Sequence, residues 1–121
     1  YFSQQTELIK EIHQQLTEHL DQRFTIEELS KQYLINTSTL KEIFKAVYGQ
    51  PIATYMKEFR MRQAMKLLRE TNATIADISS QAGYQTQGKF SSAFQSIVKM
   101  SPREYRKIQS IAPSDSFSKT P

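Results

Sequence analysis

The stretch TIADISSQAGYQTQGKFSSAFQSIV, residues 74–98, decides the fold. Thr74 followed by Asp77 is typical of a helix start, because the hydroxyl caps a free backbone N–H and an acidic side chain favours the first turn. Gly83 supplies the positive φ that ends this short helix. Apolar residues then recur at helical spacing over residues 87–98. The stretch therefore predicts two helices joined by a tight turn.

The same pattern occurs about fifty residues earlier in the chain. Thr25 and Glu28 form a capping box, the polar cluster at 36–38 offers a second cap, and Gly49 ends the helix that follows. The sequence therefore contains one helical unit twice. The matching pairs at an offset of 49 are Thr25 and Thr74, Ile26 and Ile75, Leu29 and Ile78, Ser30 and Ser79, and Gln32 and Gln81. The matching pairs at an offset of 50 are Leu40 and Phe90, Phe44 and Phe94, Val47 and Ile97, and Tyr55 and Tyr105.

Three further helices are predicted outside the repeated stretches. Apolar periodicity favours a helix over 5–20, Pro51 opens an uninterrupted helix over 52–71, and the capping box Ser101-Pro102-Arg103-Glu104 opens a last one. The fold class is thus all-α, with about seven helices in two helix-turn-helix subdomains. The predicted divisions are 5–51 for the first subdomain, 52–71 for the joining helix, 72–109 for the second subdomain and 110–121 for a flexible tail.

Composition excludes several functional classes. The 121 residues (14.1 kDa) contain no cysteine, so disulfide scaffolds, cysteine-ligated zinc and thiol nucleophiles are excluded. His13 and His19 lack ligand-like neighbours, which predicts surface histidines and neither metal nor cofactor. No apolar run suits a membrane span. The first residue is Tyr1 and no secretion leader is present, so we expect a cytoplasmic piece of a longer protein.

The positive charge lies in the second half of the chain. Residues 1–54 carry five Lys/Arg and seven Asp/Glu, whereas residues 55–121 carry eleven and five, for a total of +4. A basic half suggests a polyanionic partner, either nucleic acid or a membrane surface, although a solvated basic surface gives the same composition.

The repeated unit has the shape of a helix-turn-helix, whose second helix fits the major groove. The exposed faces of the two second helices carry short hydrogen-bonding side chains and lysines, which suit base edges and phosphates. A 20-residue joining helix of roughly 30 Å is close to the spacing of about 34 Å between successive major grooves. Two alternatives are a duplicated hairpin without a binding role and a protein-interaction module. An enzyme lacks support, since no paired carboxylates, nucleophile–base pair or glycine-rich phosphate loop is present.

Several short motifs of the chain form a specific set. They are Ile75-Ala76-Asp77-Ile78, Ala82-Gly83-Tyr84, Phe90-Ser91 with Phe94, Ser101-Pro102-Arg103-Glu104-Tyr105-Arg106-Lys107, and Arg60-Met61-Arg62-Gln63-Ala64 with Leu67-Leu68. Through this set, residues 8–109 resemble the DNA-binding domain of AraC/XylS-type bacterial transcription regulators. The resemblance implies double-stranded DNA as partner, transcription activation with RNA polymerase, and an effector or dimerisation domain N-terminal to this segment. The family's alkyl-transferring branch is excluded by the absence of cysteine.

The resemblance implies base readers on both recognition helices: Ser38, Thr39 and Glu42 on the first, and Gln87, Gly88, Ser91 and Ser92 on the second. Phosphate contacts are expected from Thr37, Lys41, Lys45, Lys89, Gln95, Ser101, Arg106 and Lys107. Arg106 and Lys107 alternatively only solvate the last helix, and Gln87 alternatively caps its helix or contacts phosphate. Arg60 is expected in a structural role rather than on phosphate.

Three positions depart from the family pattern. Glu42 and Ser92 stand where relatives often carry arginine, which removes an arginine-to-guanine contact from the first helix and positive charge from the second. Lys99 replaces the usual glycine after the second recognition helix, so a strained or differently shaped helix end is expected there.

Overall fold

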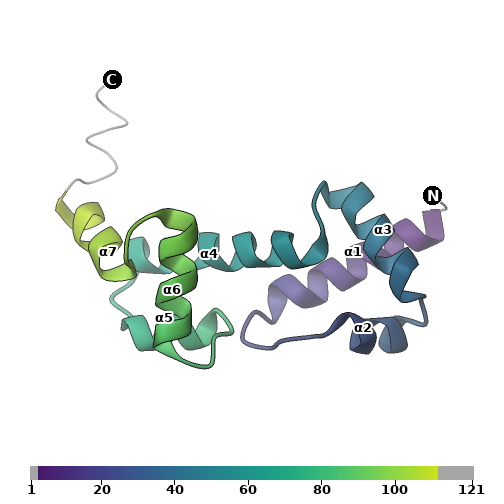
Figure 1. The fold of residues 1–121 in the computed structure, drawn as a ribbon, viewed down its shortest axis with the longest axis horizontal. Helices are drawn as coiled ribbons and strands as arrows, with labels where there is room; N and C mark the ends of the chain where they lie inside the picture. Colours follow the sequence, from purple (N-terminus) through teal and green to yellow (C-terminus); the bar gives the residue numbers. More distant parts are fainter. Residues whose placement is uncertain (1–2, 112–121) are drawn as a thin grey trace, which may run out of the picture. The chain divides into compact units, whose positions relative to one another are not determined.

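The structure, a computed structural model, describes residues 3–111. Over that range it contains seven helices and no strand, which confirms the all-α prediction (Figure 1). The chain divides into two compact units: unit 1 ends at Phe59 and unit 2 begins at Arg60. The boundary falls inside α4 (Ile52–Glu70), which is one continuous helix.

Unit 1 is built from α1 (Ser3–Glu18), α2 (Ile26–Tyr33), α3 (Thr37–Tyr48) and the first part of α4. The capping box at the start of α2 is present: Thr25 N donates to Glu28 Oε1 at 2.7 Å, and Glu28 N donates to Thr25 Oγ1 at 3.0 Å. One apolar stripe of each helix is buried. The buried core residues are Ile9, Ile12, Leu16, Leu29, Ile35, Leu40, Ile43, Phe44, Ile52 and Met56.

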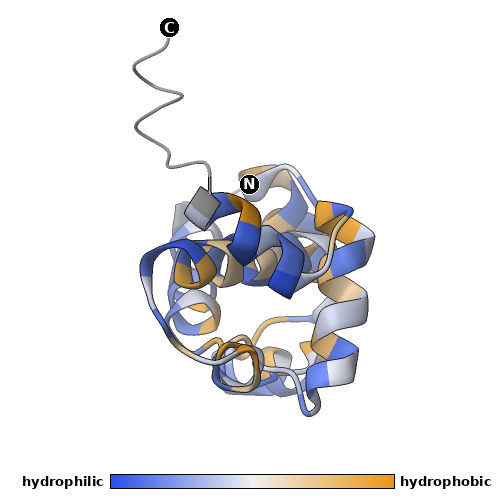
Figure 2. Cartoon of the chain, turned by 90° about the vertical axis from the view of Figure 1, so that its left-hand side faces the viewer, coloured by the Kyte–Doolittle hydropathy of each residue, from blue (hydrophilic) through white to orange (hydrophobic). Residues whose placement is uncertain are grey.

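Unit 2 repeats this arrangement with the rest of α4, α5 (Ile75–Gln81), α6 (Gln87–Val98) and α7 (Pro102–Ile111). Ser101 and Glu104 form the predicted reciprocal cap of α7, with bonds of 2.9 and 3.1 Å. Hydrophobic positions are interspersed with hydrophilic ones on the helices (Figure 2), as expected where one stripe of a helix is buried. The buried core residues are Met61, Ala64, Leu68, Ile78, Ala82, Phe90, Phe94 and Tyr105.

The turn before α3 and the turn before α6 are each held by a serine of the preceding helix, Ser30 in unit 1 and Ser79 in unit 2. In unit 1 the backbone N–H of Ile35 donates to the carbonyl of Ser30 at 3.1 Å, and in unit 2 that of Tyr84 donates to Ser79 at 3.0 Å. The hydroxyl of each serine also donates to a backbone carbonyl of the turn. Ser30 Oγ donates to the carbonyl of Ile35, and Ser79 Oγ donates to the carbonyl of Thr86 at 3.2 Å. The repeat seen in the sequence is therefore a repeat of structure.

The bounds of α1 and α7 differ from the prediction by two residues, and α4 ends at Glu70 rather than at residue 71. α1 spans Ser3–Glu18 rather than 5–20, because the chain turns after Glu18 and Leu20 packs against the core from this turn. α7 continues to Ile111, past the predicted end at 109, and Ser110 Oγ donates to the carbonyl of Lys107 at 3.1 Å. The rest of the predicted tail, 112–121, lies outside the described residues.

His13 is not the surface histidine that the sequence suggested. Its Nε2 lies 2.8 Å from the hydroxyl of Tyr55, and its ring stacks on Tyr48 with 4.3 Å between ring centroids. Burial lowers the pKa of His13, because desolvation disfavours the charged imidazolium. His13 therefore belongs to the aromatic packing of unit 1.

The strained helix end expected at Lys99 is present. Lys99 has φ 71° and ψ 20°, and its N–H donates to the carbonyl of Gln95. The equivalent residue of unit 1 is Gly49, with φ 84°. Side chains other than glycine pay about 1–2 kcal/mol in this left-handed region.

Lys99→Gly is therefore expected to stabilise the chain by roughly 0.5–1 kcal/mol, since strain relief exceeds the added entropy of the unfolded glycine. Thermal unfolding at fixed salt measures the effect. Lys99→Gln is the matched control, because it removes the same charge but keeps the Cβ atom and the strain. An equal rise in melting temperature for both variants would assign the gain to charge and contradict the strain argument.

Candidate nucleic-acid interface

The two candidate recognition helices are oriented by their buried residues. In α3, Leu40, Ile43 and Phe44 are fully buried, and in α6 Phe90 and Phe94 are. The opposite faces are open to solvent. Exposed there are Ser38, Lys41, Glu42 and Lys45 on α3 and Gln87, Gly88, Lys89, Ser92 and Gln95 on α6, whereas Thr37, Thr39 and Ser91 are half-buried.

In unit 1 a groove of about 720 Å³ runs beside α3. One wall is the exposed face of α3, and the other is formed by Ile26 at the start of α2 and by residues 51–53 at the start of α4. The groove brings together four residues predicted as DNA contacts: Ser38, Lys41, Glu42 and Lys45.

Unit 2 has a smaller groove, of about 240 Å³, beside α6. Gln87 and Ser91 of α6 face Ile75 at the start of α5 and residues 101–103 at the start of α7. Five of the six lining residues occupy positions equivalent to lining residues of the first groove: Ile75, Ser91, Ser101, Pro102 and Arg103 correspond to Ile26, Lys41, Pro51, Ile52 and Ala53, whereas Gln87 corresponds to Thr37, which does not line the first groove. One groove has thus been built twice.

Several predicted site residues lie outside these grooves. Lys89, Ser92 and Gln95 are exposed on α6 without lining the groove, and Gly88 stands in open space, where an added Cβ would meet no atom within 4 Å. Lys107 is exposed on α7. The roles of these residues remain predictions.

The helix starts also refine two predicted contacts. Asn36 rather than Thr37 caps α3: its side-chain oxygen accepts from the backbone N–H of Ser38 at 2.8 Å. Thr37, the first residue of α3, is therefore not its cap. Thr86 caps α6 and accepts from the N–H of Lys89 at 3.1 Å, so the alternative in which Gln87 caps its own helix is wrong.

Arg60 and Arg106 donate hydrogen bonds to backbone carbonyls of unit 2. Arg60 is 3% exposed, and its Nη1 donates to the carbonyl of Ala82 at 2.7 Å, which confirms the expected structural role. Arg106 donates from Nε to the carbonyl of Leu68 at 3.1 Å and from Nη2 to that of Thr71 at 3.2 Å. Arg106 thus caps the end of α4, and a phosphate contact from it remains a prediction.

Arg103 is the groove residue that the sequence reasoning missed. In the sequence, Arg103 belongs to the capping motif that opens α7 and to a motif of the family resemblance, but not to the predicted DNA contacts; the structure places it in the groove with Gln87 and Ser91. The repeat gives no signal for it, because an offset of 50 pairs Arg103 with Ala53, which is not among the predicted contacts.

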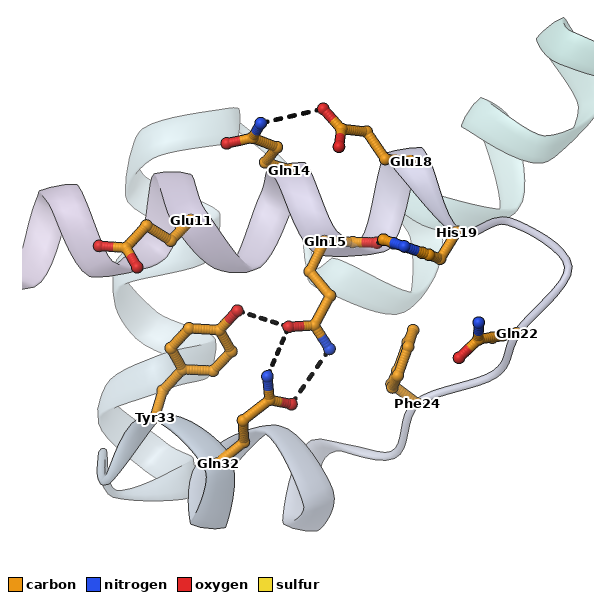
Figure 3. A pocket seen from close by; sticks show the side chains of 9 residues that line it. All are labelled: Glu11, Gln14, Gln15, Glu18, His19, Gln22, Phe24, Gln32 and Tyr33. Atoms are coloured by element: carbon orange, nitrogen blue, oxygen red, sulfur yellow. Dashed lines mark hydrogen bonds between the residues drawn. The ribbon is translucent and has the colours of Figure 1, made fainter.

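A further groove of unit 1, about 600 Å³, lies between α1 and α2 (Figure 3). Its side chains are mainly glutamines and glutamates, and the amides of Gln15 and Gln32 bond each other at 2.7 and 3.1 Å. It contains no recognition-helix residue. Within residues 3–111 no cluster of three potential metal ligands occurs, and no helix has the length and apolarity of a membrane span.

Residues 29–108 match a family described as "Helix-turn-helix domain". A putative AraC-like transcription regulator from Streptomyces lividans is 37% identical over 84 residues, which is 69% of this chain and 28% of that protein. The chain belongs to the AraC-type helix-turn-helix family.

Other relatives agree with AraC-type membership. The transcriptional activator RhaR of Mannheimia succiniciproducens is 32% identical over 91 residues, which is 75% of this chain and 33% of that protein. The DNA-binding domain of AdpA, solved in complex with a target DNA, has a TM-score of 0.80 at 20% identity and covers 87% of this chain and 95% of that one. The AraC-type relatives are bacterial transcription regulators, and the chain spans about a third of the length of the curated ones it matches.

Proposed function

We propose that this chain binds double-stranded DNA sequence-specifically as part of a bacterial transcription activator and has no enzymatic activity. The observation that carries this proposal is the groove built twice, each time beside the exposed polar face of a helix-turn-helix second helix. AraC-type membership supports the same function. In this proposal α3 and α6 enter successive major grooves of one duplex, and the continuous helix α4 joins them.

The proposed roles follow from chemistry and position. Hydroxyl and carboxamide side chains at the start of a recognition helix meet base edges, and lysines on its flank meet phosphates. Gln offers a donor and an acceptor to adenine, and Glu accepts from cytosine N4. The proposed base readers are Ser38, Thr39, Glu42, Gln87, Gly88, Ser91 and Ser92; the proposed phosphate contacts are Thr37, Lys41, Lys45, Lys89, Gln95, Ser101, Arg106 and Lys107.

The larger protein is proposed to act in the cytoplasm together with RNA polymerase, with an effector-binding or dimerisation domain N-terminal to this segment. The length of the relatives supports the further domain, because the chain corresponds to 28–33% of the first two. RhaR of Mannheimia succiniciproducens, named as an activator, supports the activating role.

A salt titration separates DNA binding from the alternative of a protein-interaction module. Binding of the chain to a duplex is measured by fluorescence anisotropy between 50 and 300 mM salt, since each neutralised phosphate adds about −0.9 to the slope of log K against log salt. We expect a slope of several units and a site selected from a randomised duplex pool. Absence of any selected site would contradict sequence-specific binding.

Lys45 and Lys89 provide the first residue-level test. Lys45→Ala and Lys89→Ala are each expected to weaken binding to all sequences alike and to lower the salt slope by about one, because each removes one phosphate contact. The comparison uses Lys66→Ala, an exposed lysine on α4 that lines neither groove. A change of preference at a single base pair would mean that the lysine concerned reads a base.

A further inference from the structure

The two grooves carry their positive charge on opposite walls. In unit 1 the cations Lys41 and Lys45 belong to the recognition helix, and the facing wall has Ala53. In unit 2 the equivalents of the two lysines are Ser91 and Gln95, which are uncharged, while Arg103 takes the place of Ala53. The second groove therefore has its cation on α7, across from the recognition helix.

The backbone of Arg103 is held in place at the start of α7. Pro102 is buried and occupies the first helical position, where its fixed φ suits the helix. The reciprocal bonds between Ser101 and Glu104 enclose Arg103 on both sides. Hydrogen bonds from the backbone N–H and the side chain of Ser101 to the carboxylate lower the pKa of Glu104, which favours the ionised form that caps the N–H of Ser101.

The guanidinium of Arg103, in contrast, is open to a ligand. Arg103 is exposed and lines the groove, and no hydrogen bond or ion pair joins it to another residue within 3–111. The groove's other polar side chains, Gln87, Ser91 and Ser101, are uncharged. An anion is thus the ligand that this site favours, and a planar fork of N–H donors binds phosphate in a bidentate manner.

We infer that Arg103 is the phosphate anchor of unit 2. This inference rests on the proposed DNA binding and adds to it a residue and a wall of the groove. A DNA strand enters with a phosphate between α6 and α7, where Arg103 holds it from the α7 side. The anchor fixes the register of the duplex against α6, and Gln87 and Ser91 remain available for base edges.

With Arg103 as the anchor, the two units differ in the helix that supplies the cation of the groove. Unit 1 binds phosphate with lysines of the recognition helix itself, next to Glu42, which shares the groove. In unit 2, Arg103 adds a phosphate contact from α7 to the one proposed for Lys89 on α6.

The test compares three variants on two duplexes, a site selected by the wild-type chain and a fixed 30-base-pair duplex of unrelated sequence. Arg103→Gln is expected to weaken binding to both about tenfold and to lower the salt slope by about one. Arg103→Lys, which keeps the charge but not the fork, is expected to keep the slope and lose part of the affinity. Lys66→Gln removes one exposed charge outside the grooves and is expected to change binding less than threefold.

Each outcome decides the question. An equal loss of affinity for Arg103→Gln and Lys66→Gln would reject Arg103 as the phosphate anchor, because Arg103 would then contribute to binding only through the net charge of the chain. A changed preference at one base pair with an unchanged slope would make Arg103 a base reader and also overturn it. Failure of the wild-type chain to bind either duplex would reject the proposed function and the anchor with it, whereas wild-type binding with unaffected variants rejects the anchor alone.

Discussion

Phe94→Ala and Phe44→Ala are each expected to lower the free energy of unfolding by about 3–5 kcal/mol, because a buried ring is lost and a cavity remains. Both side chains are 0% exposed. Phe94 lies 5.7 Å from the rings of Phe90 and Tyr105, measured between centroids. Phe44 is 4.8 Å from Tyr48 and 5.5 Å from Tyr55. Neither cluster can close over the missing ring without moving several aromatic side chains.

Because the chain has two units with separate cores, the two substitutions should have local as well as global consequences. Phe94→Ala is expected to reduce amide hydrogen-exchange protection mainly in α5, α6 and α7, and Phe44→Ala mainly in α1, α2 and α3. Urea denaturation measures the size of the effect. Gln95→Ala, an exposed neighbour in α6, is the control and should stay within about 0.5 kcal/mol. Melting temperatures within one degree of wild type for both phenylalanine variants would mean that these rings do not hold the cores.

The helices of this fold were predictable because their boundaries are encoded locally. Thr25 with Glu28, and Ser101 with Glu104, lie three residues apart, and each pair forms both bonds of its capping box. The repeat at offsets of 49 and 50 then indicated that the two halves of the chain share one arrangement of helices. The end of α1 was misplaced because Leu20 continues the apolar spacing while the backbone has already turned.

The parts that sequence reasoning missed depend on contacts between distant residues. Arg106 caps α4 through carbonyls 35 and 38 positions away, and His13 meets Tyr55 across 42 positions. Helical periodicity assigns a side chain to a face but not to a partner on another helix. Arg103 was overlooked for this reason: the capping motif explained its neighbours completely, and only the packing of α6 against α7 shows that it lines a groove.

Gln87 is the residue on which the base-reading proposal depends most. It is exposed in the first turn of α6, where recognition helices meet base edges, and Thr86 rather than Gln87 provides the helix cap. The adjacent Gly88 stands in open space, so the folded chain itself does not require glycine there. A close approach of the bases to the backbone at Gly88 would explain the missing side chain. A base contact and a phosphate contact are the two alternatives for Gln87, since the groove that it lines also contains Arg103, the proposed phosphate anchor.

Gln87→Ala is therefore expected to cost about 1–3 kcal/mol on the selected site and to relax the preference at one base pair, while the salt slope and the affinity for unrelated DNA stay nearly unchanged. The carboxamide carries no charge, so its removal releases no counterion. Binding selection on a randomised duplex, carried out with both proteins, measures the preference, and Gln85→Ala serves as an exposed control outside α6 and the groove. A uniform loss on all sequences, with no base pair relaxed, would place Gln87 on phosphate beside Arg103 and move base reading in unit 2 to Ser91 and Ser92.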